Sequence, residues 1–315
     1  MAEKKIGILM MAYGTPRSIE EIEPYYTHIR GGRKPSKELL NELIDRYERI
    51  WEINQFAEIT DQQLEKVVDR LNERYSDVQF KGYLGLKHIS PFIEDAVTVM
   101  NQDGINEAVS VVLAPHYSSL SVQVYNERAQ KKANEFGDLR IYSVEKWYDH
   151  PLFIEFWAKQ LAKILDQMSA SEKEKAVVIF SAHSLPKRIL ASQDPYPQQL
   201  KETISRIAEK VELPNYRLGW QSAGQTPEPW LEPDIEELTK KLFIEEGMNS
   251  FIYCPIGFVA EHMEVLYDND ICCKAITDKL GAKYYRPEMP NTDPLFIECL
   301  AQVIEAELRQ KGVIR

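Results

Sequence analysis

The fold is decided by one kind of stretch, of which Ala176-Val177-Val178-Ile179-Phe180-Ser181 is the clearest example. Apolar and polar side chains do not alternate along it, so both faces of a strand formed here would be buried. Such strands are typical of parallel sheets that have helices on both sides. Eight runs of this kind predict strands, at about residues 5–12, 78–83, 108–114, 140–144, 176–181, 217–222, 251–255 and 283–285.

Segments of helical period separate these runs. Ser36 is placed to cap a helix that ends at Ile50, and Thr60 with Gln63 has the spacing of a capping box for a helix that ends at Tyr75. An apolar stripe with the spacing of a helix laid on a sheet follows the second strand, and it consists of Ile93, Ala96, Val97 and Met100.

The strands divide evenly around a long helix predicted at 151–168, which we expect to bridge the two halves. The pattern favours an α/β protein of two doubly wound, Rossmann-like parallel-sheet domains, 1–150 and 151–315, with a cleft between them. A C-terminal helix from about Pro294 is expected to pack back on the body.

Composition narrows the possible partners. The 315 residues are 44% hydrophobic and carry a net charge of −11, which argues against nucleic acid as a ligand. No segment is long and apolar enough to predict a membrane span. The four cysteines contain no C-x-x-C pair and favour a reducing cytoplasm. The basic segment 30–34 fits either an anionic small molecule or a solvated turn.

Polar residues follow the predicted strands at the end where parallel sheets bind ligands. Neither a G-x-G-x-x-G loop after a strand, a Walker-type loop nor a G-x-S-x-G elbow occurs, so histidines and carboxylates remain as the candidates for metal handling or proton transfer. Glu264, Asp268 and Cys272 are spaced by four and would share one face of a helix. One interpretation is that these side chains pass a metal cation along the helix. The other is that they form a solvated acidic face.

Six short segments stand at these strand ends: Met11-Ala12-Tyr13-Gly14-Thr15-Pro16, Gly85-Leu86-Lys87-His88, Leu113-Ala114-Pro115-His116, Ser181-Ala182-His183-Ser184-Leu185-Pro186, Gly219-Trp220-Gln221-Ser222 and Val265-Leu266-Tyr267-Asp268-Asn269-Asp270. In this order, and from about residue 5 to residue 310, they resemble the ferrochelatase family. The chain is most similar to the soluble, monomeric coproporphyrin ferrochelatases of Gram-positive bacteria.

The resemblance implies roles for individual residues. His183 and Glu264 would be the catalytic pair and would ligate iron across the macrocycle from Tyr13, with Asp268 as a further metal ligand and a possible outer Mg²⁺ site. Iron must displace two pyrrole protons, so an imidazole and a carboxylate near the ring supply both ligation and a general base. The residues expected to contact the porphyrin are Tyr13, Arg30, Arg46, Tyr47, Asn54, Lys87 and Tyr125.

The expected activity is insertion of Fe²⁺ into a porphyrin in haem biosynthesis, most simply coproporphyrin III to give coproheme, with protoporphyrin IX as the other substrate. No prosthetic group is expected, and we expect a cytoplasmic monomer that can pass its product to a downstream haem-pathway enzyme. The chain departs from the family's Gly-Gly and Ser-Pro-Leu pattern at residues 51–56, and it has Cys272 where relatives carry a carboxylate. A non-catalytic porphyrin- or haem-binding paralogue and a chelatase for another metal or tetrapyrrole are the alternatives.

Overall fold

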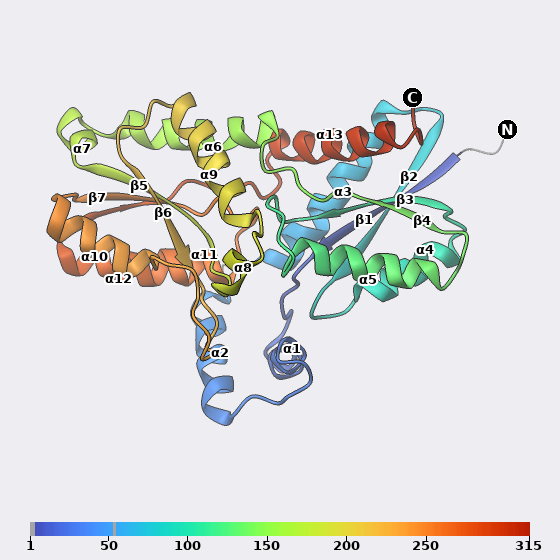
Figure 1. Cartoon of the computed structure of the whole chain (residues 1–315), viewed down its shortest axis with the longest axis horizontal. Helices are drawn as coiled ribbons and strands as arrows, with labels where there is room; N and C mark the ends of the chain where they lie inside the picture. Colours follow the sequence, from blue (N-terminus) through green and yellow to red (C-terminus); the bar gives the residue numbers. More distant parts are fainter. Residues whose placement is uncertain (1–3, 53–54) are drawn as a thin grey trace. The chain divides into compact units, whose positions relative to one another are not determined.

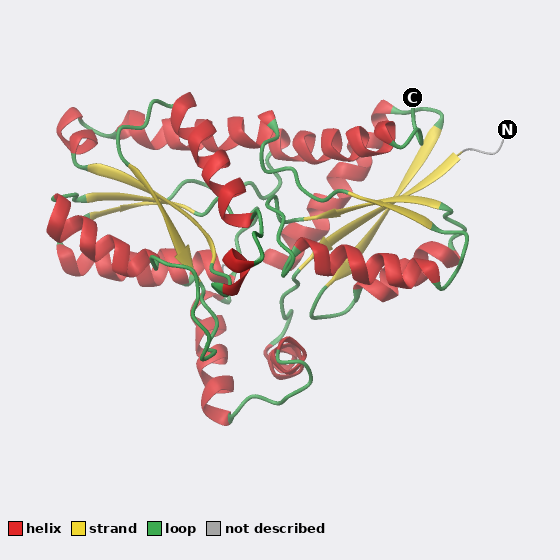
Figure 2. Ribbon diagram, viewed as in Figure 1, coloured by secondary structure: helices red, strands yellow, loops and turns green. Residues whose placement is uncertain are grey.

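The computed structural model describes residues 4–52 and 55–315. The chain forms two compact units, which are considered one at a time. Unit 1 comprises Met1–His150 and Asn291–Arg315, and unit 2 comprises Pro151–Pro290. Both units are α/β, with a twisted sheet between layers of helices (Figure 2). The predicted fold class, with eight strands in two parallel sheets, is confirmed.

The sheet of unit 1 has four parallel strands in the order β2-β1-β3-β4. Their bounds are Lys4–Ala12 for β1, Val78–Leu86 for β2, Glu107–Val112 for β3 and Arg140–Ser143 for β4. One face is covered by α3 (Phe56–Arg74) and α13 (Pro294–Gln310), and the other by α4 (Ile93–Gln102) and α5 (Val122–Asn134) (Figure 1). Between β1 and α3 the chain forms a short 3₁₀ turn, η1 (Ile19–Glu21), and two helices, α1 (Ile22–Ile29) and α2 (Lys37–Ile50).

Unit 2 repeats this topology, since its parallel strands have the order β6-β5-β7-β8. The strands are β5 (Ala176–His183), β6 (Tyr216–Gln221), β7 (Ser250–Cys254) and β8 (Lys283–Tyr285). Helices α6 (Pro151–Gln167) and α9 (Tyr196–Lys210) lie on one face, and α10 (Ile235–Glu246) and α12 (Lys274–Leu280) on the other. The shorter elements are α7 (Ala170–Glu174), α8 (Arg188–Ala191), α11 (Met263–Leu266) and the π-helix η2 (Asp268–Cys273).

Two of the three helix signals in the sequence are confirmed. The Ser36 hydroxyl accepts a hydrogen bond from the backbone N–H of Leu39 at 3.3 Å, and α2 begins directly after it. The apolar stripe of α4 is buried in the core of unit 1. The capping box at Thr60 is wrong, because α3 begins at Phe56 and Thr60 lies inside it. Its hydroxyl donates instead to the carbonyl of Phe56 at 2.7 Å, as threonines within helices do.

The last helix corrects the expected extent of the second domain. We expected that domain to continue to residue 315, but unit 2 ends at Pro290 and α13 belongs to unit 1. Arg74 on α3 pairs with Glu298 at 2.8 Å and with Glu305 at 2.7 Å, which ties the two helices together. The long helix expected as a bridge, α6, lies wholly within unit 2.

Candidate active site

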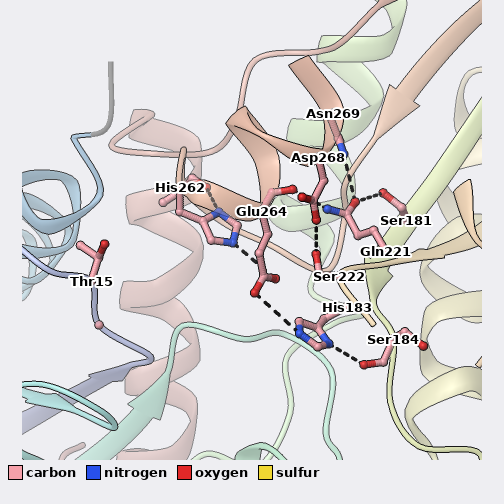
Figure 3. Close-up of polar contacts among 12 residues, drawn as sticks. Thr15, Ser181, His183, Ser184, Gln221, Ser222, His262, Glu264, Asp268 and Asn269 are labelled. Carbon is pink, nitrogen blue, oxygen red and sulfur yellow. Dashed lines mark hydrogen bonds and ion pairs between the residues drawn. The ribbon is translucent and has the colours of Figure 1, made fainter. Parts of the chain in front are cut away.

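The carboxyl end of the unit 2 sheet gathers polar side chains from three adjacent strands. His183 is the last residue of β5, Gln221 is the last residue of β6, and the segment after β7 carries His262 and Glu264 (Figure 3). Gly257 lets this segment approach closely, because a Cβ there would lie 2.5 Å from the Cβ of Ala182. Strand order and a close backbone approach therefore bring the two predicted catalytic residues together.

His183 and Glu264 face each other across this edge. The Nε2 atom of His183 lies 3.6 Å from Oε1 of Glu264, and its Nδ1 atom lies 2.5 Å from the carbonyl oxygen of Ser184. Since a carbonyl only accepts, Nδ1 is the donor of this contact, and Nε2 is the ring nitrogen that faces Glu264. The buried hydroxyl of Tyr196 donates to the backbone carbonyl of His183 at 3.1 Å. The imidazole thus has a fixed ring orientation and a fixed backbone.

A second histidine adjoins the same carboxylate. His262 packs on the ring of Phe258 at 4.6 Å between centroids and donates from Nδ1 to the carbonyl of Ala260 at 3.0 Å. Its Nε2 atom lies 3.9 Å from Oε2 of Glu264. Burial acts to raise the pKa of Glu264, but the charges of His183 and His262 outweigh it, so the pKa is lowered. Glu264 is therefore ionised at neutral pH.

The predicted row of Glu264, Asp268 and Cys272 is not a row on one α-helix. Helix α11 ends at Leu266, and Asp268 and Cys272 lie in the π-helix η2. The spacing of four that led to the prediction does not fit the i to i+5 bonding of a π-helix. The Asp268 carboxylate accepts a short hydrogen bond from the hydroxyl of Ser222, the residue after β6. Asp268 is thereby joined to the same sheet edge.

In unit 1, the corresponding sheet edge presents a lysine between two tyrosines. The ammonium of Lys87 lies 5.0 Å from the ring centre of Tyr125 and 6.0 Å from that of Tyr13. Burial and the charge of Arg128 lower the pKa of Lys87 to about 8. Among residues 4–52 and 55–315, no carboxylate lies within ion-pair distance of this ammonium. An anionic ligand at this edge would supply the missing counter-charge.

Arg128 on α5 holds the backbone of this lysine. It forms a bidentate ion pair with Glu94, at 2.6 and 2.7 Å, and donates to the carbonyl of Lys87 at 2.8 Å. Glu94 and Arg128 lie on helices, so the polar residues that follow the strands do not point to them. The spacing of residues along the sequence does not reveal an ion pair between two helices.

His88 extends the group at the end of β2. Its ring packs against Tyr13 with centroids 4.5 Å apart, and its Nδ1 atom lies 3.0 Å from Nδ1 of His28. Burial and the neighbouring charge of Lys87 lower the pKa of His88 to about 3, so it is neutral at physiological pH. His28 lies on α1, far from any strand end, so the strand-end pattern does not point to it either.

The other predicted porphyrin contacts have other neighbours. Tyr47 is buried, and its hydroxyl is 3.3 Å from that of Thr15. The Arg30 guanidinium lies 5.7 Å from the ring centre of Tyr26, and Arg46 is half-buried on α2. Asn54 lies outside the described residues. The structure thus joins two predicted groups, His183 with Glu264 in unit 2, and Lys87 with Tyr13 and Tyr125 in unit 1.

The fold of the chain is similar to that of solved chelatase structures. It is similar to a solved structure of SirB from Bacillus subtilis with Fe³⁺, with a TM-score of 0.59 and 12% identity over 98% of each chain. A sirohydrochlorin chelatase SirB from Bacillus subtilis subspecies spizizenii in complex with cobalt matches with a TM-score of 0.60 and 10% identity, over 98% of this chain and 97% of that one. At such low identity the likeness shows the fold alone.

The sequence comparisons define the family. The ferrochelatase family model matches residues 5–308. A coproporphyrin III ferrochelatase of Halalkalibacterium halodurans is 58% identical over 311 residues, which cover 99% of this chain and 100% of that protein. One of a Geobacillus species is 56% identical over 304 residues, covering 96% of this chain and 98% of that protein. The chain therefore belongs to the ferrochelatase family, and it is a porphyrin metal chelatase.

Proposed function

We propose that this protein inserts Fe²⁺ into coproporphyrin III to give coproheme, as a step of haem biosynthesis. The observation that carries the proposal is the pairing of His183 and Glu264 at 3.6 Å on one sheet edge, within a chain of the ferrochelatase family. Relatives named coproporphyrin III ferrochelatase, at 58% and 56% identity, support the choice of porphyrin.

The chemistry needs two proton acceptors and a ligand for the incoming ion. Metal insertion replaces two pyrrole N–H protons with one Fe²⁺, so two protons must leave for each turnover. The Nε2 atom of an unprotonated His183 and the ionised carboxylate of Glu264 are both suited to ligate iron or to accept a ring proton. With side chains 36% and 23% exposed, the two groups are open to a ligand without being surrounded by water.

We assign porphyrin binding to residues of unit 1. The Lys87 ammonium, which lies between the rings of Tyr13 and Tyr125, would meet a propionate, and the exposed ring of Tyr13 would pack on the macrocycle. Arg30, Arg46, Tyr47 and Asn54 remain proposed contacts. Their assignment rests on the resemblance to the family.

Several further properties remain proposals. We propose a cytoplasmic monomer that needs no prosthetic group, passes its product to a later enzyme of haem synthesis and binds Mg²⁺ only weakly near Asp268, because Cys272 replaces a carboxylate there. The four cysteines, all within the described part of the chain, form no disulfide, as in a reducing compartment. Across the described ranges, no helix has the length and apolar character that crossing a membrane requires.

An anaerobic assay tests the proposal. The purified protein is given Fe²⁺ with coproporphyrin III or with protoporphyrin IX, and insertion is followed by the change in porphyrin absorbance and fluorescence. We expect turnover with coproporphyrin III and a lower kcat/KM with protoporphyrin IX. Tight porphyrin binding without turnover would overturn the proposal in favour of a non-catalytic paralogue. Turnover when Co²⁺ replaces Fe²⁺, with none in the presence of Fe²⁺, would indicate a chelatase for another metal.

A further inference from the structure

A buried amide lies behind the catalytic carboxylate. The side-chain nitrogen of Gln221, the last residue of β6, donates to the backbone carbonyl of Glu264 at 2.5 Å. Its side-chain oxygen accepts two hydrogen bonds, one from the Ser181 hydroxyl at 2.7 Å and one from the Asn269 amide at 3.2 Å (Figure 3). Gln221 is 1% exposed, and Ser181 and Asn269 are fully buried. The three side chains form a buried hydrogen-bonded group at this sheet edge.

The position of Glu264 in its helix explains why its carbonyl needs this partner. Helix α11 contains only Met263–Leu266, and the π-helix η2 begins at Asp268. The carbonyls at the end of an α-helix lack partners within the helix. The carbonyl of Met263 receives the N–H of Tyr267, while that of Glu264 receives Gln221. The amide thus stabilises the point at which the α-helix changes into a π-helix.

The orientation of the amide is fixed by its neighbours. The carbonyl of Glu264 only accepts, so the end of the Gln221 side chain that faces it must be the nitrogen. The Ser181 hydroxyl and the Asn269 amide then donate to the oxygen at the other end and hold this orientation. An ionised residue of the same shape without an N–H group would leave two oxygen atoms facing each other at a buried position, which is strongly unfavourable.

Ser222, the residue after Gln221, contacts the segment after β7 at a second point. Successive side chains of a regular strand point to opposite faces of the sheet. Ser222 has a φ of 58°, in the left-handed region that non-glycine residues rarely adopt, and this breaks the alternation at the end of β6. As a result, Gln221 and Ser222 both contact the segment after β7, one at Glu264 and the other at Asp268. Such strain occurs most often at functional sites.

We propose that Gln221 is a positioning residue for metal insertion, which holds the main chain of Glu264 so that its carboxylate faces His183. The inference rests on the proposed function, since it assigns Glu264 the role given there. Gln221 acts on the rate through Glu264 and does not bind the porphyrin. Changes at Gln221 should therefore lower kcat and leave the KM for porphyrin nearly unchanged.

The test compares Gln221→Glu with a matched control, Gln130→Glu. The Gln130 amide also donates to a backbone carbonyl, that of Ile141 at 2.6 Å, but it lies in unit 1 on α5. For Gln221→Glu we expect a fall in kcat of about tenfold or more, with KM for coproporphyrin III and its fluorescence-quenching affinity within about twofold of the natural values. The control should keep its kcat, although it too replaces an amide by a carboxyl group.

Ser181→Ala provides a second variant in case Gln221→Glu does not fold. It removes one of the two donors that orient the amide and leaves the nitrogen in place, so we expect kcat to fall about threefold at unchanged KM. If the natural protein inserts iron and both variants keep kcat within about 1.5-fold, the positioning role is overturned. A rise in KM that accounts for the whole loss overturns it as well. If the natural protein inserts no iron, the proposed function fails instead.

Discussion

Replacing Lys87 with methionine should make the ligand-free protein more stable and its porphyrin binding weaker. Burial and the nearby Arg128 lower the pKa of Lys87 from 10.5 to about 8, so the folded protein pays to keep this ammonium charged. The shift corresponds to a penalty of about 3 kcal/mol at neutral pH. Attraction to the rings of Tyr13 and Tyr125 offsets about 1 kcal/mol. Lys87→Met should therefore raise the free energy of unfolding by about 2 kcal/mol at pH 7.

The stability advantage of Lys87→Met over the natural protein must decrease as the pH rises. Below pH 8 the ammonium of Lys87 is charged in both the folded and the unfolded chain, so the penalty is complete. Between about pH 8 and pH 10.5 only the unfolded chain still binds the proton, and the natural protein gains stability relative to the variant as pH rises. Urea unfolding at pH 7 and about pH 9.5 should show that the advantage of the variant shrinks by about half or more.

Lys81→Met is the control, because Lys81 also lies over a tyrosine, at 5.6 Å from the ring centre of Tyr83, but pairs with Asp103 at 2.7 Å. It should change stability by no more than about 1 kcal/mol, and without a gain. Porphyrin titration of Lys87→Met should show an affinity about tenfold lower, the loss expected for one charge-assisted hydrogen bond. A variant less stable than the natural protein at pH 7, or a stability difference that does not change with pH, would refute the reasoning.

Three further outcomes follow from the site. His183→Ala should reduce iron insertion about 100-fold or more, with porphyrin affinity by fluorescence quenching within about twofold, and near-natural turnover would remove this histidine from the mechanism. Glu264→Gln keeps the shape and removes the charge, so steady-state kinetics should show a kcat about 100-fold lower at similar KM, whereas a change in KM alone would indicate only a binding contact. Cys272→Glu restores a third carboxylate, and the rate of iron insertion by this variant should respond more strongly to added Mg²⁺ than that of the natural protein. An equal or smaller response would contradict the proposed outer Mg²⁺ site.

The strands and the polar residues at their ends could be predicted from the sequence for the same reason. A strand buried on both faces, such as β5, must be apolar throughout, and the first polar residues after it mark the sheet edge where ligands bind. This reasoning located His183 and Lys87, as well as the segment that contains Glu264. His28 and Arg128 escaped it because they reach the edge from helices, and only the tertiary fold brings them there.

Two other features depend on contacts that no local pattern records. The π-helix at Asp268–Cys273 follows an α-helix without a break in composition, so spacing alone predicted a continuous α-helix. The apolar face of α13 is evident from the sequence, but its place in unit 1 involves residues more than 200 positions away, such as Arg74. Local periodicity predicts the helix and its buried face, whereas the surface against which that face packs is determined by tertiary contacts.

One arrangement recurs at the residues to which we assign the chemistry. The carbonyl of His183 receives the hydroxyl of Tyr196, that of Glu264 receives the amide of Gln221, and that of Lys87 receives the guanidinium of Arg128. In each case the donor comes from another helix or strand and binds the main chain, which leaves the functional side chain free to meet a ligand. A carbonyl held this way cannot move with its side chain when a proton or a metal ion arrives. The charged and neutral forms of each side chain then have the same backbone conformation, and little reorganisation of the main chain is needed during turnover.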